Sequence, residues 1–503
     1  MNLRAVGWLL GSLILLLAGV LLVPAAVGFA FGERKEAWSC IASAAIAAAV
    51  GGGLVWSNRG SALTPEGRLD YFRREGLAVA GLTWFVVGLA GALFFLLSGA
   101  MDSLVDAFFE SASGFTTTGA TILSAEAIDR LPHALSFWRA LSHWVGGIGI
   151  VVVFVVIFPT GGRSLYRSEV SGVTREASLQ RVRDSALALM RVYVLLTAVH
   201  LVLLWLAGLS WFDATVHAFS TLATGGFSNR GASISYYGSW VVELILIVFM
   251  VAAGINFALW DSFLRIGPRR AWRAAWESNE VRLYGGLLVG ATLAMTLVLW
   301  AWGGSRGVEA SGLPDYTSFP RALRDAAFNL VSIQTCTGYA TADYDRWPDA
   351  CRLLLVVAMF VGACAGSTGG GIKVVRLLIV AKAAFAGILR FVRPRAIHDV
   401  RVDQRSLDDR FVASATRYFV LWVLAAVAGS IAISLMGSDL VTSVTGVVAC
   451  LNNCGPGLAR VGPVLDYGAM SDGAKLLLAF LMIVGRLEFY AVAALFVPGF
   501  WRR

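Results

Sequence analysis

Arg324-Asp-Ala-Ala-Phe-Asn-Leu-Val-Ser-Ile-Gln-Thr-Cys-Thr-Gly338-Tyr-Ala is a pattern that this chain repeats three more times. Aligned on Gly338, the other copies end at Gly119, Gly226 and Gly455, about 107 to 117 residues apart. The shared position thirteen residues before the glycine is held by Asp106, Asp213, Asp325 and Thr442. A second glycine follows twenty-eight or thirty residues later, at Gly147, Gly254, Gly366 and Gly485. Four copies of one unit predict a pseudo-fourfold arrangement within one polypeptide.

Each copy is expected to form a short helix that begins at the Asp or Thr as its N-cap, followed by an extended turn that contains glycine. Glycine permits the positive φ angles that let several carbonyls face one direction. In K⁺ channels four such loops point carbonyl oxygens at a dehydrated cation, and the negative ends of the preceding helices add to the field. One such turn is an ordinary loop, but four in register between apolar helices predict a cation pore. The expected filter residues are Thr117, Thr118 and Gly119, then Thr224, Gly225 and Gly226, then Cys336, Thr337 and Gly338, and finally Asn453, Cys454 and Gly455.

The composition is that of a polytopic membrane protein. Hydrophobic residues make up 57% of the 503 residues and charged residues only 15%, and the mean hydropathy is +0.72. The net charge of +9 does not indicate a nucleic-acid partner, because Lys and Arg sort by membrane side. The six cysteines form no CxxC pair, and the five histidines have no metal-site or catalytic-triad spacing. We therefore expect no enzymatic activity, no zinc site and no disulfide framework.

The apolar runs predict an all-α membrane fold of two leading helices and four tandem helix–pore loop–helix repeats around one pore. The predicted units are residues 1–56 for the leading helices, then 77–159, 187–263, 283–388 and 411–498 for the repeats. The first run resembles a signal sequence, but no clear cleavage site precedes the equally apolar second run, so we expect it to be retained.

The charges predict the orientation. About two thirds of the 41 Lys and Arg residues lie in segments that this topology places in the cytoplasm, together with both termini. Carboxylates gather in the segments on the outer side, where they either form a negative vestibule that concentrates cations or are ordinary surface acids. They are Asp102, Asp106, Glu110, Asp315, Asp343, Asp345, Asp349 and Asp466.

A glycine-rich segment interrupts the second helix expected in the third repeat. Residues 362–373 read Gly-Ala-Cys-Ala-Gly-Ser-Thr-Gly-Gly-Gly-Ile-Lys, and five glycines in ten residues oppose a continuous helix. Non-helical backbone at membrane depth persists only where it is buried in protein or faces water. We expect a gating loop beneath the filter, with close helix packing as the alternative. Its residues are Gly366, Ser367, Thr368, Gly369, Gly370, Gly371 and Lys373.

Arg486 lies well inside the last predicted helix. An intramembrane charge is costly unless it faces protein or water. We expect Arg486 to project below the filter, as an electrostatic barrier or as an anchor for the glycine-rich loop. A salt bridge with Glu488 is a weaker alternative, because side chains two residues apart point to different helix faces.

These motifs resemble the Trk/Ktr/HKT superfamily of cation transporters. The four filter segments, residues 365–373, Trp144-Val-Gly-Gly-Ile-Gly149 and Gly485-Arg-Leu-Glu488 carry the resemblance, and the two leading helices are similar to its TrkH branch. The resemblance implies a K⁺-uptake subunit of the bacterial inner membrane, surrounded by lipid and working as a homodimer with one pore per protomer. It also implies a cytoplasmic TrkA-type regulatory ring that binds NAD(H) or ATP/ADP, since the chain has no nucleotide site of its own.

The expected mechanism is channel-like permeation of K⁺ through the filter, with the glycine-rich loop as the gate. The alternative is a symporter coupled to H⁺ or Na⁺, for which few pore-facing acids or histidines are found at membrane depth. A membrane-embedded enzyme would need a cluster of catalytic side chains, and none is evident. Gly119 favours K⁺, because plant relatives with serine at the first filter glycine tend towards Na⁺.

Overall fold

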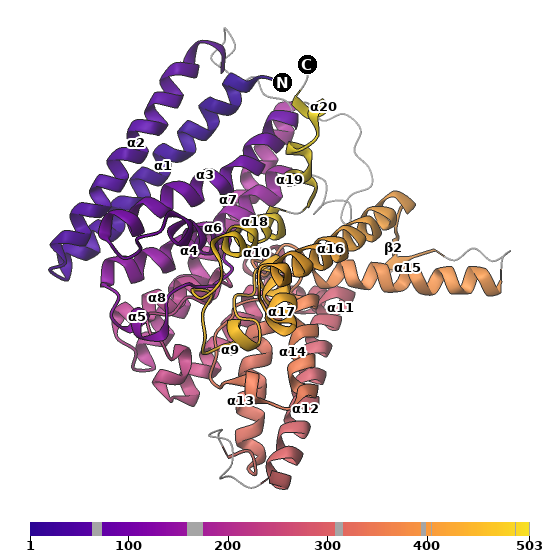
Figure 1. Cartoon of the computed structure of the whole chain (residues 1–503). Helices are drawn as coiled ribbons and strands as arrows, with labels where there is room; N and C mark the ends of the chain where they lie inside the picture. Colours follow the sequence, from indigo (N-terminus) through magenta and orange to yellow (C-terminus); the bar gives the residue numbers. More distant parts are fainter. Residues whose placement is uncertain are drawn as a thin grey trace.

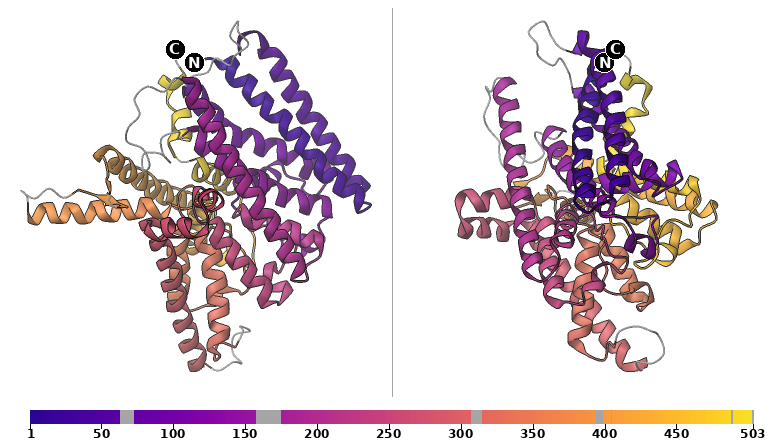
Figure 2. Two further views of the ribbon diagram at one scale, coloured as in Figure 1. Left: turned by 180° about the vertical axis from the view of Figure 1, so that it is seen from behind. Right: turned by 90° about the vertical axis from the view of Figure 1, so that its left-hand side faces the viewer.

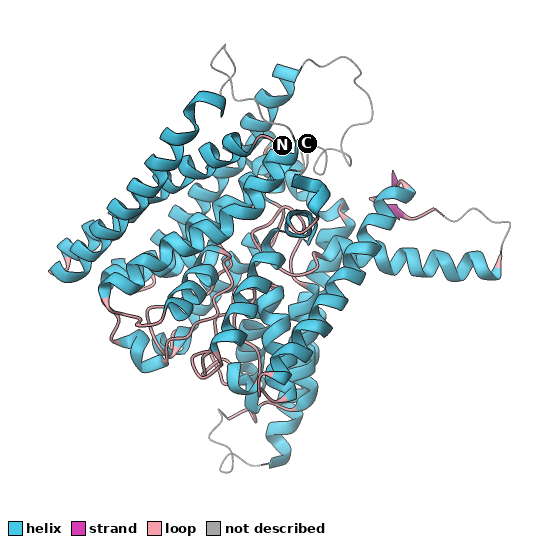
Figure 3. Ribbon diagram, turned by 45° about the horizontal axis from the view of Figure 1, so that its top comes forward, coloured by secondary structure: helices cyan, strands magenta, loops and turns pink. Residues whose placement is uncertain are grey.

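The computed structural model describes residues 1–62, 73–157, 175–306, 315–393, 399–403, 405–487 and 489–501, and these are mostly helical (Figure 3). Among them the only strands are β1 (Arg401–Val402) and β2 (Arg405–Ser406), which pair antiparallel. The predicted all-α class is confirmed. Glu488 and parts of the basic loops used to predict the orientation lie outside the described residues.

The two leading helices, α1 (Leu3–Ala30) and α2 (Arg34–Ala62), form a long hairpin at one edge of the molecule (Figure 1). They touch through small residues, since a Cβ added to Gly11 or to Gly51 would stand 2.8 Å from the carbonyl oxygen of the other. Such close backbone contact is typical of helices packed within a membrane. The two chain termini lie near each other on one side of the structure.

The first helix of each repeat is long, apolar and uninterrupted. These helices are α3 (Arg73–Ser98), α7 (Arg175–Leu206), α12 (Asn279–Arg306) and α16 (Asp409–Leu435). Together with α1 and α2 they give six helices in the described part of the chain that are long and apolar enough to cross a membrane. Their outer faces expose large apolar side chains, among them Leu206, Val289 and Leu424 at 60% exposure or more, as expected of surfaces in contact with lipid.

Each of the four short pore helices packs against the long first helix of its own repeat, and Figure 2 shows the four repeats in their sequence colours from two further sides. The pore helices are α4 (Leu104–Phe115), α8 (Trp211–Leu222), α13 (Phe319–Gln334) and α17 (Leu440–Leu451). Their C-terminal halves are buried on nearly every side. The residues directly after the pore helices are not helical, and Figure 3 shows loops running among the helices in the interior of the molecule.

The predicted N-caps of the pore helices are wrong by three residues or more. Ser103, Ser210 and Asp439 cap α4, α8 and α17, each accepting a hydrogen bond from the backbone N–H three residues later. The aligned Asp and Thr residues stand at that third helical position, and in α13 Asp325 lies still further inside. A short oxygen-bearing side chain before the first turn reaches this N–H, whereas a carboxylate within the turn acts on the helix dipole.

The second helix is interrupted in three repeats. In the first repeat α6 (His133–Ile157) is continuous, whereas we expected continuous helices in the second and fourth repeats too. In the second repeat α9 (Trp240–Ala253) and α10 (Phe257–Ile266) meet at an angle of 95°, and in the fourth repeat α18 (Asp472–Leu487) and α19 (Phe489–Leu495) also form a bent pair. In the third repeat the glycine-rich segment separates α14 (Asp349–Val361) from α15 (Val374–Val392).

The break between α9 and α10 is fixed by one local cap and by hydrogen bonds to the distant glycine-rich segment. Asn256 caps α10 by accepting from Ala258 N, and the carbonyl of Gly254 accepts from Cys364 N in the glycine-rich segment instead of continuing the helix. The broken helix and the glycine-rich segment therefore share backbone hydrogen bonds. The short helices α5 (Ala125–Asp129), α11 (Pro268–Glu277) and α20 (Pro498–Trp501) complete the fold.

Candidate cation filter and gate

The four predicted filter segments share one backbone conformation. At each filter glycine φ lies between 78° and 86°. The residue two positions earlier is never glycine, but it also has a positive φ, between 53° and 59°. The residue between these two positions has no positive φ in any of the four segments. The non-glycine positions are Thr117, Thr224, Cys336 and Asn453. Alternation of ordinary and left-handed conformations turns successive carbonyls towards one side, and such strained residues persist only where the surrounding structure holds them.

The four segments form a closed ring. A Cβ added to Gly119 would collide with the carbonyl oxygen of Gly225, and one on Gly226 with that of Thr337. A Cβ on Gly338 would stand 2.6 Å from the carbonyl oxygen of Cys454. A Cβ on Gly455 would stand 2.7 Å from the carbonyl oxygen of Thr118, so the fourth filter segment contacts the first and the ring is closed. Each glycine thus packs against the carbonyl that precedes the next glycine, and no side chain larger than hydrogen fits between neighbouring segments.

The pore helices end at this ring. Their C-caps are the residues directly before the filter segments, Thr116, Ala223, Thr335 and Asn452. The partial negative charge at the end of each helix is therefore directed at the same place as the carbonyls. No group of three or more His, Cys, Asp or Glu side chains within the described ranges could hold a metal ion. This arrangement suits a dehydrated monovalent cation held by main-chain oxygens.

The glycine-rich segment between α14 and α15 lies beneath the ring. Thr368 Oγ1 donates to the carbonyl of Leu222 at 2.9 Å, and Gly371 N donates to that of Asn452 at 3.1 Å. A Cβ on Gly369 would stand 3.1 Å from the carbonyl oxygen of Thr335. The segment therefore contacts the C-terminal ends of the second, third and fourth pore helices at once, which places it across the inner end of the ring.

Arg486 is buried and donates from Nη1 to the carbonyl oxygen of Thr368 at 2.8 Å. Its Nε and Nη2 have no hydrogen-bond partner among the described residues. The guanidinium thus contacts the glycine-rich segment, and its positive charge lies just inside the ring. Both sequence-based roles, anchor and electrostatic barrier, are compatible with this position.

Two further charged side chains hold the glycine-rich segment. Lys373 has a φ of 77°, and its Nζ donates back to the carbonyl of Gly369 at 2.7 Å. Glu280, in the first turn of α12, accepts a hydrogen bond from Ala365 N at 2.6 Å. The neighbouring Asn279 N donates to Asp403 in the turn between β1 and β2. Glu280 was not among the predicted site residues, because no local sequence pattern connects it to a segment 85 residues away.

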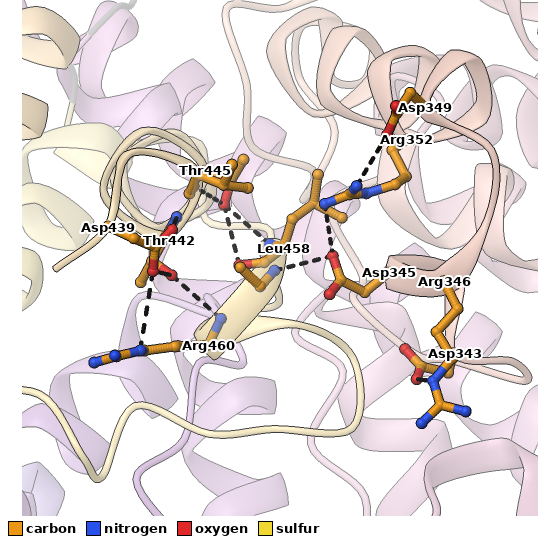
Figure 4. Close-up of polar contacts among 12 residues, drawn as sticks. Asp343, Asp345, Arg346, Asp349, Arg352, Asp439, Thr442, Thr445, Leu458 and Arg460 are labelled. Carbon is orange, nitrogen blue, oxygen red and sulfur yellow. Dashed lines mark hydrogen bonds and ion pairs between the residues drawn. The ribbon is translucent and has the colours of Figure 1, made fainter.

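The carboxylates expected at the outer mouth are mostly paired with cations. Asp106 binds Lys475 of α18 at 2.6 Å, and Glu110 is fully buried against Arg139 at 2.8 Å. Figure 4 shows Asp345 and Asp349 binding Arg352, and Asp343 binding Arg346. Burial raises the pKa of Asp343 above its ordinary value. Among the described residues Asp102, Asp315 and Asp466 form no ion pair, and Asp345 and Asp349 share Arg352, so only about half of the negative charge of the eight carboxylates is compensated by ion pairs.

The sequence model of the cation transport protein family TrkH matches residues 42–502. The chain belongs to the TrkH cation transport protein family. The superfamily resemblance found in the motifs is thereby confirmed.

Relatives within the TrkH family match the whole chain. It is 36% identical over 507 residues to the Trk system potassium uptake protein TrkH of Salmonella typhimurium, with 100% of both sequences covered. It is 31% identical to the Trk system potassium uptake protein TrkG of Escherichia coli K12, covering 99% of that protein. The crystal structure of the potassium transporter TrkH from Vibrio parahaemolyticus matches with a TM-score of 0.88 and 33% identity over 100% of both chains.

Proposed function

We propose that this chain is the K⁺-permeating subunit of an uptake system in a bacterial inner membrane. Support comes from the TrkH family membership, from relatives that are named potassium uptake proteins, and from six helices suited to cross a membrane. The observation that carries the proposal is the closed ring in which four glycines each pack against the carbonyl of the next segment.

Permeation follows from the chemistry of the ring. K⁺ exchanges its water for the carbonyl oxygens of residues 117–119, 224–226, 336–338 and 453–455, which are uncharged and held at fixed spacing by the left-handed backbone. The ends of the four pore helices offset part of the dehydration cost. The membrane potential supplies about 2.3 kcal/mol per charge per 100 mV, which can drive uptake without a coupled ion against a K⁺ gradient of up to about fifty-fold.

The glycine-rich segment is the gate in this proposal. It crosses the inner end of the ring and is held by a few separable contacts from Arg486, Thr368, Lys373 and Glu280. Glycines let such a segment change its backbone conformation at low cost. A nucleotide-binding ring of the TrkA type would act from the cytoplasm to release these contacts, and two copies of the chain would form a homodimer with a pore in each protomer.

Reversal potentials of the purified protein in planar bilayers test this function. A channel reverses at the K⁺ equilibrium potential whether or not a pH or Na⁺ gradient is imposed. A reversal potential that shifts with the pH gradient at constant K⁺ would instead indicate the symporter. The recording requires an open gate, so a variant with a shortened glycine-rich segment is measured beside the natural chain.

A further inference from the structure

Each pore helix carries a polar side chain that hydrogen-bonds the segment leaving the filter. We call this side chain the filter brace of its repeat. The four filter braces are Glu110, His217, Asn329 and Thr445, which lie nine residues before the filter glycine in the first three repeats and ten before it in the fourth. All four are buried, with at most 4% of their surface exposed.

The brace of the first repeat is a carboxylate. Glu110 accepts from the Thr121 hydroxyl at 2.9 Å and from Ile122 N at 3.1 Å. Arg139 neutralises it at 2.8 Å and also donates to the carbonyl of Ser228 at 3.2 Å, in the segment that leaves the second filter. One buried ion pair therefore fixes two neighbouring segments of the ring.

The brace of the second repeat is an imidazole. His217 Nδ1 lies 2.7 Å from the carbonyl oxygen of Asp213, one helical turn earlier, and must donate to it because a carbonyl can only accept. In the neutral ring Nε2 is then an acceptor, and it lies 3.2 Å from the hydroxyl of Ser228. The tautomer is set by the helix, and the free acceptor is directed at the segment.

The braces of the third and fourth repeats are neutral. Asn329 donates from Nδ2 to the carbonyl of Asp325 and to the Thr341 hydroxyl, and its Oδ1 accepts from Thr341 N at 3.2 Å. Figure 4 shows Thr445 contacting Leu458, whose N–H donates to the Thr445 hydroxyl at 3.0 Å. Four different functional groups thus perform the same contact at the same place.

We propose that the filter braces are positioning residues that set the width of the carbonyl ring and thereby its preference for K⁺ over Na⁺. The residues that the braces contact lie two or three positions beyond the filter glycine. Each filter segment is therefore held at both ends: the pore helix fixes the end where the segment begins, and the brace on that same helix fixes the end where it leaves the filter. A segment held at both ends cannot move inwards to contact a smaller ion. This inference rests on the proposed K⁺ filter and adds the residues that keep it wide.

The second repeat offers a matched test. His217 and His200 are both fully buried histidines of that repeat, but His200 stacks on Phe249 and has no hydrogen bond to any described residue. The ratio of K⁺ to Na⁺ flux is measured in liposomes for His217→Leu, His200→Leu and His217→Asn, each in the natural chain and in the variant with the shortened glycine-rich segment, which keeps the gate open. The asparagine reproduces the brace found in the third repeat, with its amide able to donate to the same helical carbonyl.

His217→Leu is expected to lower the flux ratio about five-fold, the factor that corresponds to one neutral hydrogen bond. His200→Leu should leave it unchanged, and His217→Asn should restore most of it. Ser228→Ala removes the hydroxyl that bonds to His217 without altering the pore helix, and it should lower the flux ratio by the same factor. This variant tests the proposal if His217→Leu does not fold. Equal ratios for the two leucine variants, no rescue by asparagine, or an unchanged Ser228→Ala would overturn the proposal.

The proposed filter is tested separately in the same liposomes by Gly119→Ser. If the natural chain shows no K⁺ preference, or Gly119→Ser does not reduce it, the filter assignment fails. If Gly119→Ser reduces the preference and His217→Leu behaves as His200→Leu, only the role of the braces fails.

Discussion

Replacement of Gly119 by serine is expected to remove most of the preference for K⁺. Gly119 has a φ of 80°, which costs an L-residue about 1–2 kcal/mol, and the new Cβ would collide with the carbonyl oxygen of Gly225. That oxygen belongs to the neighbouring filter segment, so it must move out of the ring. At Gly455, where the gap is 2.7 Å, a shift of about 0.7 Å restores an ordinary contact. At Gly119 and Gly226 the required shift is larger.

The assay is the ratio of K⁺ to Na⁺ flux into liposomes that contain the purified protein. We expect a loss of at least about ten-fold, or 1.4 kcal/mol, for Gly119→Ser and Gly226→Ser, and a smaller loss at Gly338 and Gly455. Gly32→Ser is the control, since Gly32 also has a positive φ of 77° but would meet nothing within 4 Å. An unchanged ratio in folded Gly119→Ser protein, or an equal loss in Gly32→Ser, would refute the reasoning.

Three further predictions concern the gate and the buried ion pair. Arg486→Gln removes the positive charge that contacts the Thr368 carbonyl and should raise K⁺ leak without altering the ratio of K⁺ to Na⁺ flux. A changed flux ratio would instead assign Arg486 a role in selectivity. Glu280→Ala removes the hydrogen bond donated by Ala365 N, worth about 0.5–1.5 kcal/mol, and should raise K⁺ leak several-fold. Glu277→Ala, exposed on α11, should not raise the leak, and liposome flux measures both variants. Glu110→Gln leaves Arg139 buried beside a neutral group and should cost about 3–5 kcal/mol of unfolding free energy, seen as a lower midpoint in thermal unfolding. A midpoint equal to that of the natural chain would mean that the pair contributes nothing.

The parts of the fold that depend on local pattern could be predicted from the sequence. Apolar length located the helices that cross the membrane, and the four-copy alignment located the residues that form the ring. The glycine-rich segment was recognisable because five clustered glycines oppose a helix regardless of tertiary context. The predicted N-caps were wrong because the aligned Asp and Thr residues stand at the third helical position of α4, α8 and α17, whereas the residue that caps each of these three helices is a serine or aspartate three positions earlier, which only its hydrogen bond identifies.

The contacts between distant segments could not be predicted. Glu280 and Ala365 meet across 85 residues, and the break after α9 depends on Cys364 donating to Gly254. The only sequence feature that the four filter braces share is a polar residue nine or ten positions before each filter glycine. Carboxylate, imidazole, amide and hydroxyl share no sequence pattern, so only the common geometry reveals their common position.

The most direct test of the central claim is a crystal structure of the protein grown with Tl⁺, which replaces K⁺ and scatters anomalously. The account predicts Tl⁺ peaks on the axis of the ring, coordinated by the main-chain oxygens of Thr118, Gly225, Thr337 and Cys454. Anomalous density located only at carboxylate side chains, with none inside the ring, would contradict it.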